Sequence, residues 1–568
     1  MKSQARLQAL LGDIYSSETA RLLAERISKR VSEVSVQIAD RALWCESDVL
    51  LITYADSFSE ENQPPLLSLK QFLRDYAPGL FSQVHLLPFY PYTSDDGFAV
   101  SDYLKVAGHN GSWSDIDALT NDHDLVFDYV INHGSSQHPR FKEFLDDRPP
   151  GNQYFITADP ETDVSKVTRP RASSLLQEYQ TAKGVQFVWC TFSRDQVDWN
   201  FANPEVLYDF VEVFIQYIEH GARWLRIDAI AYLWKQLGTN CVHLPQTHGV
   251  VKVLRAVADA ISPTIKLLTE TNVPQDENLS YFGDGDEAHI VYNFSLPPLL
   301  THTLLSGDSG HLTRWCRSLP ALPPGCTLLN FTASHDGVGL RPAEGILSER
   351  ETKNLVNCLR SFGGLVTERR RPDGSLSPYE ANISMFDAFK GTVAGIDSLQ
   401  TERFLLSQCL MLALKGVPAL YYNSLLATPN NLEGLKATGR NRTINRRKWT
   451  LTEVSERLDP VDGQPRRVLD GLRTMLNVRR QQTAFHPESE QVCLDLDTQL
   501  FAIKRTAANS GQCLICVFNV SDKSTQVPVA DLGVVKLSER RAVYRTGDLR
   551  FDRETLGMGP YAAIWYEI

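Results

Sequence analysis

The 568-residue sequence predicts an α/β fold: a (β/α)8 barrel with inserted loop subdomains and a small C-terminal β-domain. Three observations lead to this prediction. Eight short, nearly continuous apolar runs recur along the chain, longer helical patterns separate them, and polar side chains follow several of the runs. Such apolar runs are typical of parallel strands that are covered on both faces. Eight of them with helices between predict a closed barrel.

The segments follow one another in a simple order. Residues 1–45 look helical and amphipathic, and we expect an N-terminal extension outside the barrel. The barrel is predicted over 46–484, with strands at 49–58, 84–92, 125–133, 223–232, 265–270, 288–296, 327–336 and 417–424. After about residue 485 the helical pattern gives way to short β-like runs, which predict a C-terminal β-domain over 485–568.

Two long insertions interrupt the alternation of strands and helices. They span 134–197, after the third strand, and 341–400, after the seventh. Long loops in compact domains usually bind or cover ligands. We therefore expect both insertions to shape a binding site.

Composition narrows the class of protein. Hydrophobic residues make up 43% and charged residues 22%, as in ordinary globular proteins, and the net charge is −11. Nucleic acid is excluded as the main partner, because binding its phosphates needs a basic face. The N-terminus lacks the apolar core of a signal peptide, and no run approaches the roughly 18 apolar residues that cross a bilayer. These features predict a cytoplasmic protein without a membrane partner.

The ten cysteines are scattered along the chain. The close pair, Cys513 and Cys516, lies in a predicted strand without a second pair or a histidine cluster. We interpret both as packing residues rather than metal ligands, since free cysteine behaves as a small hydrophobic residue. Free thiols also fit a reducing compartment.

Polar side chains cluster where predicted strands end, and in parallel barrels these ends meet at the face that carries active sites. They are Asp128, Asn132 and His133, then Arg226 and Asp228, then Glu270, then His335 and Asp336. Taken singly, an aspartate there is as often a helix cap, and a histidine is more often a buried core residue. For Asp128 and Asn132 we favour a structural role.

Three carboxylates among these residues suggest a reaction. Cleavage of a glycoside with retention needs one carboxylate to attack the anomeric carbon and a carboxylic acid to protonate the leaving oxygen. The three strand-end carboxylates would supply this pair and one more to orient the sugar hydroxyls.

The segments DYVINH (128–133), WLRIDAIAY (224–232), LLTETN (267–272) and FTASHD (331–336) resemble the four signature regions of the α-amylase-type glycoside hydrolase superfamily, in the same order. The resemblance implies that Asp228 is the nucleophile, Glu270 the acid/base and Asp336 the third carboxylate. It also implies that Arg226 steadies Asp228, and that His133 and His335 hydrogen-bond to the bound glucosyl unit.

Further segments resemble the sucrose phosphorylase branch of that superfamily: HLLPFYPYTSDDGF (85–98), KQLGTNCVHLPQT (235–247), HDGVGLRP (335–342) and GRNRTINRR (439–447). The resemblance implies that Asp95 pairs with Arg446 to close the pocket around one glucosyl unit, with Phe98 as an apolar platform. The alternative for this pair is a surface ion pair of little energetic value. The branch implies double displacement with inorganic phosphate as co-substrate, α-glucose 1-phosphate as product, and neither calcium nor an organic cofactor.

The segments 335–347 and 368–388 resemble glucosylglycerate phosphorylases of the same branch. An acceptor carboxylate would need arginine or lysine beside it, and the candidates are Arg341 and the run Arg369–Arg371. For the run, the alternative is a solvated basic loop.

Other functions stay open at this level. They are a sucrose or sucrose 6-phosphate phosphorylase, a hydrolase or transglucosidase with the same carboxylates, and a non-catalytic transporter-accessory barrel. The three retained acids and the absence of an anchor argue against the last. The acceptor, the physiological direction and the choice between monomer and homodimer also stay open.

Overall fold

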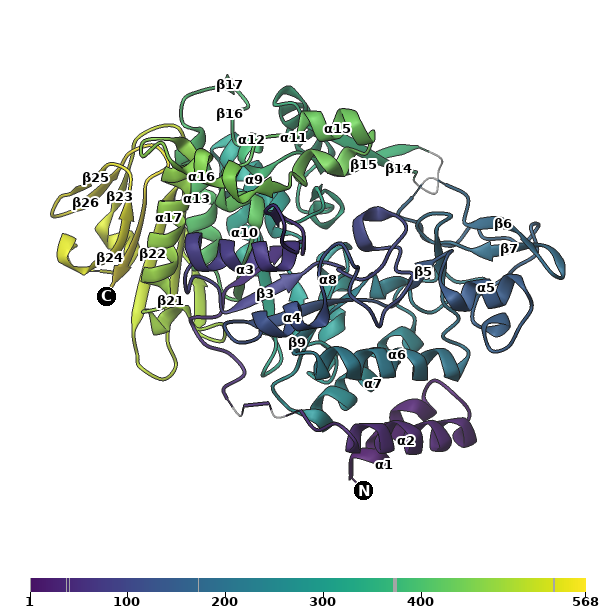
Figure 1. Cartoon of the computed structure of the whole chain (residues 1–568). Helices are drawn as coiled ribbons and strands as arrows, with labels where there is room; N and C mark the ends of the chain where they lie inside the picture. Colours follow the sequence, from purple (N-terminus) through teal and green to yellow (C-terminus); the bar gives the residue numbers. More distant parts are fainter. Residues whose placement is uncertain (1, 37, 40, 172, 371–374, 535–536) are drawn as a thin grey trace.

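Eight parallel strands form a closed barrel in the computed structural model, which describes all residues except 1, 37, 40, 172, 371–374 and 535–536 (Figure 1). The strands follow chain order around the barrel: β1 (Leu50–Thr53), β3 (Gln83–Leu86), β4 (Asp124–Val130), β9 (Ala222–Asp228), β10 (Lys266–Thr269), β11 (Ile290–Tyr292), β12 (Thr327–Phe331) and β18 (Val417–Tyr421). Each overlaps one of the eight predicted runs, so the predicted barrel is confirmed.

Helices form the outer layer between successive strands. They include α3 (Pro65–Tyr76), α6 (Pro204–Glu219), α7 (Pro245–Ile261), α9 (Leu296–Ser306), α13 (Gln400–Ala413) and α17 (Gln464–Arg479). In α6 the side chain of Asn203 caps the first turn by accepting from the backbone N–H of Glu205. Its apolar face, which includes Phe210, Phe214 and Ile218, is buried against the barrel, and this burial supplies most of the stability of such a helix.

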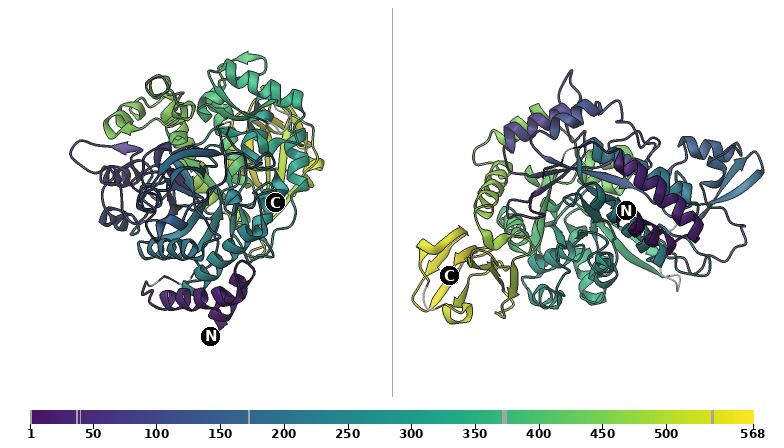
Figure 2. Two further views of the ribbon diagram at one scale, coloured as in Figure 1. Left: turned by 90° about the vertical axis from the view of Figure 1, so that its right-hand side faces the viewer. Right: turned by 90° about the horizontal axis from the view of Figure 1, so that it is seen from below.

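The N-terminal segment forms two helices, α1 (Lys2–Gly12) and α2 (Ser17–Ser32), which lie alongside α6 and α7 (Figure 2). Leu23 and Ile27 of α2 are buried, and Arg30 pairs with Glu212 and Glu219 of α6. The helices therefore cover the outside of the barrel.

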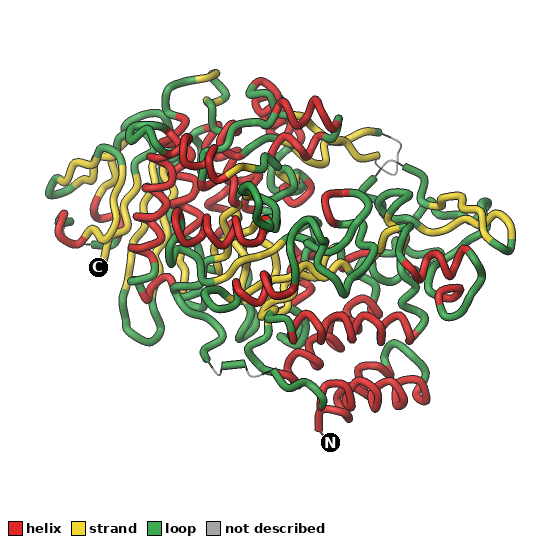
Figure 3. Tube along the Cα trace, in the orientation of Figure 1, coloured by secondary structure: helices red, strands yellow, loops and turns green. Residues whose placement is uncertain are grey.

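The first insertion reaches away from the barrel as a hairpin of β6 (Leu176–Thr181) and β7 (Gly184–Trp189), on the side opposite the C-terminal strands (Figure 3). Its two ends are joined by β5 (His133–Ser135) and β8 (Gln196–Asp198). The second insertion contains α11 (Glu349–Ser361) and a sheet of β13 (Val338–Gly339), β15 (Leu376–Asn382) and β14 (Leu365–Arg370).

The C-terminal strands form two sheets. One has the order β20 (Glu490–Cys493), β21 (Leu500–Thr506), β22 (Cys513–Asn519), β27 (Ala563–Glu567), β24 (Ala542–Thr546); the other has the order β23 (Thr525–Pro528), β26 (Thr555–Met558), β25 (Leu549–Phe551). A separate apolar cluster that includes Leu500, Val527 and Leu556 lies between them. The other face of the larger sheet, with Phe518 and Trp565, joins the core that extends through the barrel.

In the described part of the chain, no helix has both the length and the apolar character that crossing a bilayer requires. All ten cysteines are free thiols, and Cys516 is buried within β22.

Candidate active site

A cavity at the carboxyl ends of the barrel strands brings the predicted polar residues together. Of the ten site residues predicted from the sequence, seven line it: Asp95, Phe98, His133, Asp228, Glu270, His335 and Asp336. Arg226, Arg341 and Arg446 are not among the lining residues. The three predicted carboxylates therefore face a single cavity.

Strand pairing sets Asp228 and Glu270 side by side. The strands β9 and β10 are parallel neighbours, and Thr269 lies opposite Ile227. The residues that follow these two, Glu270 and Asp228, therefore lie next to each other. Glu270 Oε2 accepts from the backbone N–H of Ala229 at 3.2 Å. Ala229 adopts a positive φ of 51°, which turns the chain immediately after Asp228. The backbone turn that follows Asp228 thus fixes the carboxylate of Glu270 by a hydrogen bond.

Arg226 forms an ion pair with Asp228. The two residues are separated by one position on β9 and point to the same side, because side chains alternate along a strand. Arg226 Nη1 lies 2.8 Å from Asp228 Oδ1 and also donates to Asp128, which is its register partner on β4. Asp128 in turn lies 2.8 Å from His85 Nε2, and all of these groups are buried. Arg226 is thereby fixed between two carboxylates.

Asp228 and Glu270 both have raised pKa values. Burial raises the pKa of Asp228 well above its ordinary value, although the positive charge of Arg226 acts to lower it. A negative charge on Glu270 raises this pKa further. Burial also raises the pKa of Glu270, although the charge of Arg226 acts to lower it. Because a charge on Glu270 opposes ionisation of Asp228, one of the two carboxyls ionises before the other. Of the two carboxyls, Asp228 is the one that accepts a hydrogen bond from Arg226. We therefore expect Asp228 to ionise first.

Asp336 has the opposite environment. Burial opposes its ionisation, but Arg442, His335 and Arg446 overcome that effect and hold its pKa well below the ordinary value. Arg442 Nη1 lies 2.6 Å from Asp336 Oδ1. Asp336 is therefore a permanent negative charge beside the cavity.

Phe98, His133 and His335 line the cavity with one aromatic and two imidazole rings. The Phe98 ring stacks on His335, with centroids 5.0 Å apart and planes 8° apart, and His133 Nε2 lies 3.0 Å from the carbonyl oxygen of Phe98. Burial lowers the pKa of His133 to about 4 and the pKa of His335 well below its ordinary value. Both rings are neutral near pH 7 and can hydrogen-bond to a neutral sugar.

One predicted pairing was wrong. Arg446 pairs with Asp96, Nη1 to Oδ2 at 2.5 Å, and not with Asp95, whose Oδ2 accepts instead from Gln196 Nε2 at 3.2 Å. Both aspartates have positive φ, 55° and 49°, so the turn sends their side chains in different directions. Arg446 also lies 3.6 Å from Asp336 and donates to the carbonyl oxygen of His335.

Arg341 and Arg369, two of the predicted acceptor arginines, are not among the lining residues. Arg341 Nη2 is 3.6 Å from Glu277 Oε2, and Arg369 Nη2 is 2.7 Å from Glu344 Oε1. Arg370 belongs to β14, and Arg371 lies outside the described residues. Their part in acceptor binding stays a prediction.

Several cavity residues were missed at the sequence level. Arg442, Tyr232, Arg171, Gln196 and Tyr379 all line the cavity. Arg442 and Tyr232 lie within segments that resemble the family, but nothing in their spacing singled them out. Arg171 and Gln196 come from the first insertion and Tyr379 from the second, and loops of this kind carry no periodicity from which a direction could be read.

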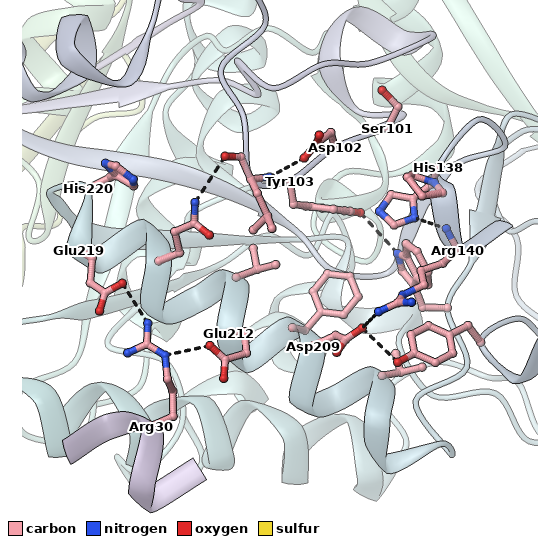
Figure 4. A pocket seen from close by; sticks show the side chains of 18 residues that line it. Arg30, Ser101, Asp102, Tyr103, His138, Arg140, Asp209, Glu212, Glu219 and His220 are labelled. Carbon is pink, nitrogen blue, oxygen red and sulfur yellow. Dashed lines mark hydrogen bonds and ion pairs between the residues drawn. The ribbon is translucent and has the colours of Figure 1, made fainter. Parts of the chain in front are cut away.

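A larger cavity, of about 710 Å³, lies outside the barrel beside α6 (Figure 4). Its charged side chains are engaged with one another: Arg30 bonds to Glu212 and Glu219, and Arg140 to Asp209 (Figure 4). It lacks the carboxylates of the strand ends. The chemistry therefore belongs to the smaller cavity. Among the described residues, no group of three or more histidine, cysteine, aspartate or glutamate side chains could hold a metal ion.

A closed parallel barrel that carries two neighbouring carboxyls of raised pKa, one of them held by an arginine, and a third carboxylate of lowered pKa is typical of carbohydrate-processing barrels of the α-amylase type. Residues 75–310 match the alpha-amylase catalytic domain. The chain is 39% identical to a glucosylglycerate phosphorylase of Spirochaeta thermophila, over 100% of this chain and 99% of that protein. It is 40% identical to the glucosylglycerate phosphorylase of Escherichia coli K12, over 92% and 94%.

Among solved structures, sucrose 6F-phosphate phosphorylase from Thermoanaerobacter thermosaccharolyticum superposes with a TM-score of 0.73 at 23% identity, over 85% of this chain and 96% of that one. This likeness supports the fold. The chain belongs to the sucrose phosphorylase branch of the α-amylase superfamily, together with the glucosylglycerate phosphorylases.

Proposed function

We propose that the protein is a retaining α-glucoside phosphorylase that converts 2-O-α-glucosylglycerate and inorganic phosphate reversibly into α-glucose 1-phosphate and glycerate. The observation that carries this proposal is the placement of Asp228 and Glu270 after neighbouring strands, on one cavity, with different partners. The names of the relatives support phosphate and glycerate as the other two reactants.

In the first half-reaction a carboxylate oxygen of Asp228 attacks the anomeric carbon and forms an ester bond to it. The bond from that carbon to the glycerate oxygen breaks, and Glu270 gives its proton to the departing oxygen. The ion pair with Arg226 keeps Asp228 ionised for the attack, and the buried setting of Glu270 keeps its proton available near neutral pH.

In the second half-reaction a phosphate oxygen attacks the same carbon while the bond to Asp228 breaks. Glu270, now ionised, accepts the proton of the attacking phosphate, and α-glucose 1-phosphate leaves. Phosphate is already anionic, so this step needs little base assistance, but it does need nearby positive charge and exclusion of water.

The remaining cavity residues hold the glucosyl unit. We propose that Asp336, Asp95, His133 and His335 bind its hydroxyls while Phe98 packs against the sugar ring. Arg442 lies 2.6 Å from Asp336 and also bonds to Glu380, so it keeps the Asp336 carboxylate in place. Inorganic phosphate is a co-substrate in this scheme, which needs no cofactor.

We also propose a cytoplasmic location, which the ten free thiols support, and a division of the chain into an N-terminal extension (1–45), a barrel with two insertions (46–484) and a C-terminal β-domain (485–568). We expect a monomer or a homodimer, which measurement of the molecular mass in solution distinguishes.

The function is tested by supplying α-glucose 1-phosphate together with glycerate, fructose, fructose 6-phosphate, glycerol or water, and measuring phosphate and free glucose. We expect glycerate to give the fastest phosphate release without matching free glucose. The Asp228→Asn variant serves as the background control.

Two outcomes would contradict the proposal. Release with fructose or fructose 6-phosphate but not glycerate would identify a sucrose-type phosphorylase. Phosphate and glucose released in equal amounts with every acceptor, water included, would identify a hydrolase.

A further inference from the structure

His85 is a buried titratable residue that the proposed mechanism does not use. It belongs to β3, is fully buried and is not among the residues that line the catalytic cavity. Among the described residues its hydrogen-bond partner is Asp128, which does not line the cavity either. Any part that His85 plays in the reaction must therefore pass through Asp128.

A row of hydrogen bonds runs from His85 across three neighbouring strands of the barrel. His85 Nε2 lies 2.8 Å from Asp128 Oδ2 on β4. The other oxygen of that carboxylate, Oδ1, accepts from Arg226 Nη1 on β9. The same nitrogen of Arg226 lies 2.8 Å from Asp228 Oδ1. The row therefore joins His85 to the proposed nucleophile through two buried side chains.

The position of the hydrogen on His85 follows from its partner. An ionised carboxylate only accepts hydrogen bonds, so Nε2 carries the hydrogen and donates it to Asp128. Nδ1 is buried and has no partner among the described residues. Burial lowers the pKa of His85 and Arg226 lowers it further, although Asp128 acts to raise it. His85 is therefore neutral near pH 7 and donates to Asp128 without adding a charge.

Asp128 and Asp228 compete for one nitrogen of Arg226, because both accept from its Nη1. Burial opposes the ionisation of Asp128, but Arg226 and His85 outweigh it and lower the pKa of Asp128. The resulting negative charge adds to the effect of burial in raising the pKa of Asp228. A hydrogen bond from His85 satisfies part of that charge, so less of it draws on Arg226 or acts on Asp228.

We propose that His85 is a positioning residue: its hydrogen bond to Asp128 leaves the Arg226 guanidinium available to Asp228 and so favours the ionised nucleophile. The inference rests on the proposed function, because it requires Asp228 to attack as a carboxylate. It adds to that function a residue on β3 that touches neither the substrate nor the nucleophile.

The test measures how the first half-reaction depends on pH. α-Glucosyl fluoride is the donor, because fluoride leaves with little help from an acid, and inorganic phosphate is the acceptor. Fluoride release gives kcat/KM at each pH, and the acidic limb of this profile reports the ionisation of Asp228 in the free enzyme. A general loss of active protein lowers the whole profile but does not move this limb.

Two variants, His85→Asn and His85→Leu, remove the donor from the position of Nε2, whereas the longer amide of His85→Gln restores it. His123→Asn is the control. His123 is a half-buried histidine that precedes β4, at the other end of that strand, and its Nδ1 lies 3.0 Å from the carbonyl oxygen of Phe81.

We expect both donor-removing variants to move the acidic limb to higher pH by about 0.5–1 unit, less than the one to two units that a direct hydrogen bond to a charged group is worth. At a pH below the limb this shift lowers kcat/KM about threefold to tenfold. His85→Gln and His123→Asn should keep the limb of the wild type. In an Asp128→Asn background, His85→Asn should not move the limb further, because no carboxylate charge is left for His85 to offset.

A limb that stays in place or moves to lower pH in the donor-removing variants would overturn the inference. So would the same shift in His85→Gln, or a further shift in the Asp128→Asn background. If one of the two donor-removing variants does not fold, as judged by circular dichroism, the other decides. Failure of the wild type to convert 2-O-α-glucosylglycerate would contradict the proposed function instead, and the profiles with α-glucosyl fluoride would still decide the role of His85.

Discussion

Asp228 and Glu270 lie one strand apart but have different partners, and this difference supports the roles proposed for them. Asp228 receives a direct hydrogen bond from the guanidinium of Arg226, whereas the one hydrogen bond that Glu270 receives from the described residues comes from the backbone N–H of Ala229. An ionised nucleophile and a protonated acid are what a retaining glucosyl transfer needs at its first step.

The two roles can be distinguished by stereochemistry. Asp228→Ala should abolish phosphorolysis, and azide supplied with α-glucosyl fluoride should enter the space left by the carboxylate and give β-glucosyl azide. Glu270→Ala should lose roughly 10²- to 10⁴-fold in phosphorolysis, and azide should attack the ester on Asp228 and give α-glucosyl azide. The anomers are identified by proton NMR coupling constants. The same anomer from both variants would reject the assignment.

The pH dependence of kcat/KM follows from the raised pKa values. Asp228 must be ionised, so activity is lost as the pH falls through its pKa, which lies above the ordinary value of about 3.9. Glu270 must be protonated, so phosphorolysis of the glucoside is lost as the pH rises through its raised pKa.

We therefore expect a bell-shaped profile, measured from initial rates of α-glucose 1-phosphate formation. In Glu270→Gln, assayed with α-glucosyl fluoride as donor, the basic limb should disappear while the acidic limb remains. A basic limb that persists in this variant would show that another group supplies the proton.

At the scale of elements, the first insertion is joined to the barrel by buried ionic contacts. Lys235 Nζ lies 2.8 Å from Asp198 of β8 and 2.7 Å from Asn132 Oδ1, and it also contacts the carbonyl oxygen of Leu233. Asn132 contacts His133, which lines the cavity, at 3.2 Å. Lys235 therefore fixes the base of the insertion that carries Gln196 and Arg171.

Replacing this buried ammonium should be costly. Lys235→Met leaves the Asp198 carboxylate buried without its counter-charge, and we expect a loss of about 3–5 kcal/mol in the free energy of unfolding. The measurement is urea denaturation followed by circular dichroism. Lys183→Met, which breaks an exposed pair with Asp147, should cost less than about 1 kcal/mol. Similar losses in the two variants would show that the Lys235 pair does not hold the insertion.

At the scale of the whole molecule, the C-terminal β-domain shares its core with the barrel. Trp565 of β27 is fully buried and belongs to the same apolar core as Leu410 and Leu412 of α13, a helix of the barrel. Arg505 of β21 donates to the carbonyl oxygens of Ala413 and His486. Apolar contact and hydrogen bonds thus bind the larger sheet to the barrel.

Trp565→Ala should destabilise the entire protein. Removal of a fully buried tryptophan costs about 3–5 kcal/mol, and the shared core predicts one thermal transition at a lower temperature, with activity lost in step. Differential scanning calorimetry with parallel activity assays provides the measurement. Val461→Ala, at a position that is 76% exposed, should leave the transition within about 0.5 kcal/mol of the wild type. A separate C-terminal transition with full activity beyond it would indicate two independent units.

The sequence by itself determined the eight barrel strands, the C-terminal β-domain and the convergence of Asp228, Glu270 and Asp336. These follow from local patterns: apolar runs define parallel strands, and closure of the barrel brings their carboxyl ends together whatever the loops do.

Only the tertiary structure decided which side chains meet across the loops. Asp96 rather than Asp95 binds Arg446, because two successive residues of positive φ turn their carboxylates in different directions. Arg442 and Arg171 reach the cavity from segments far apart in the chain. Such contacts depend on how insertions fold over the barrel, and no periodic pattern in the sequence encodes that direction.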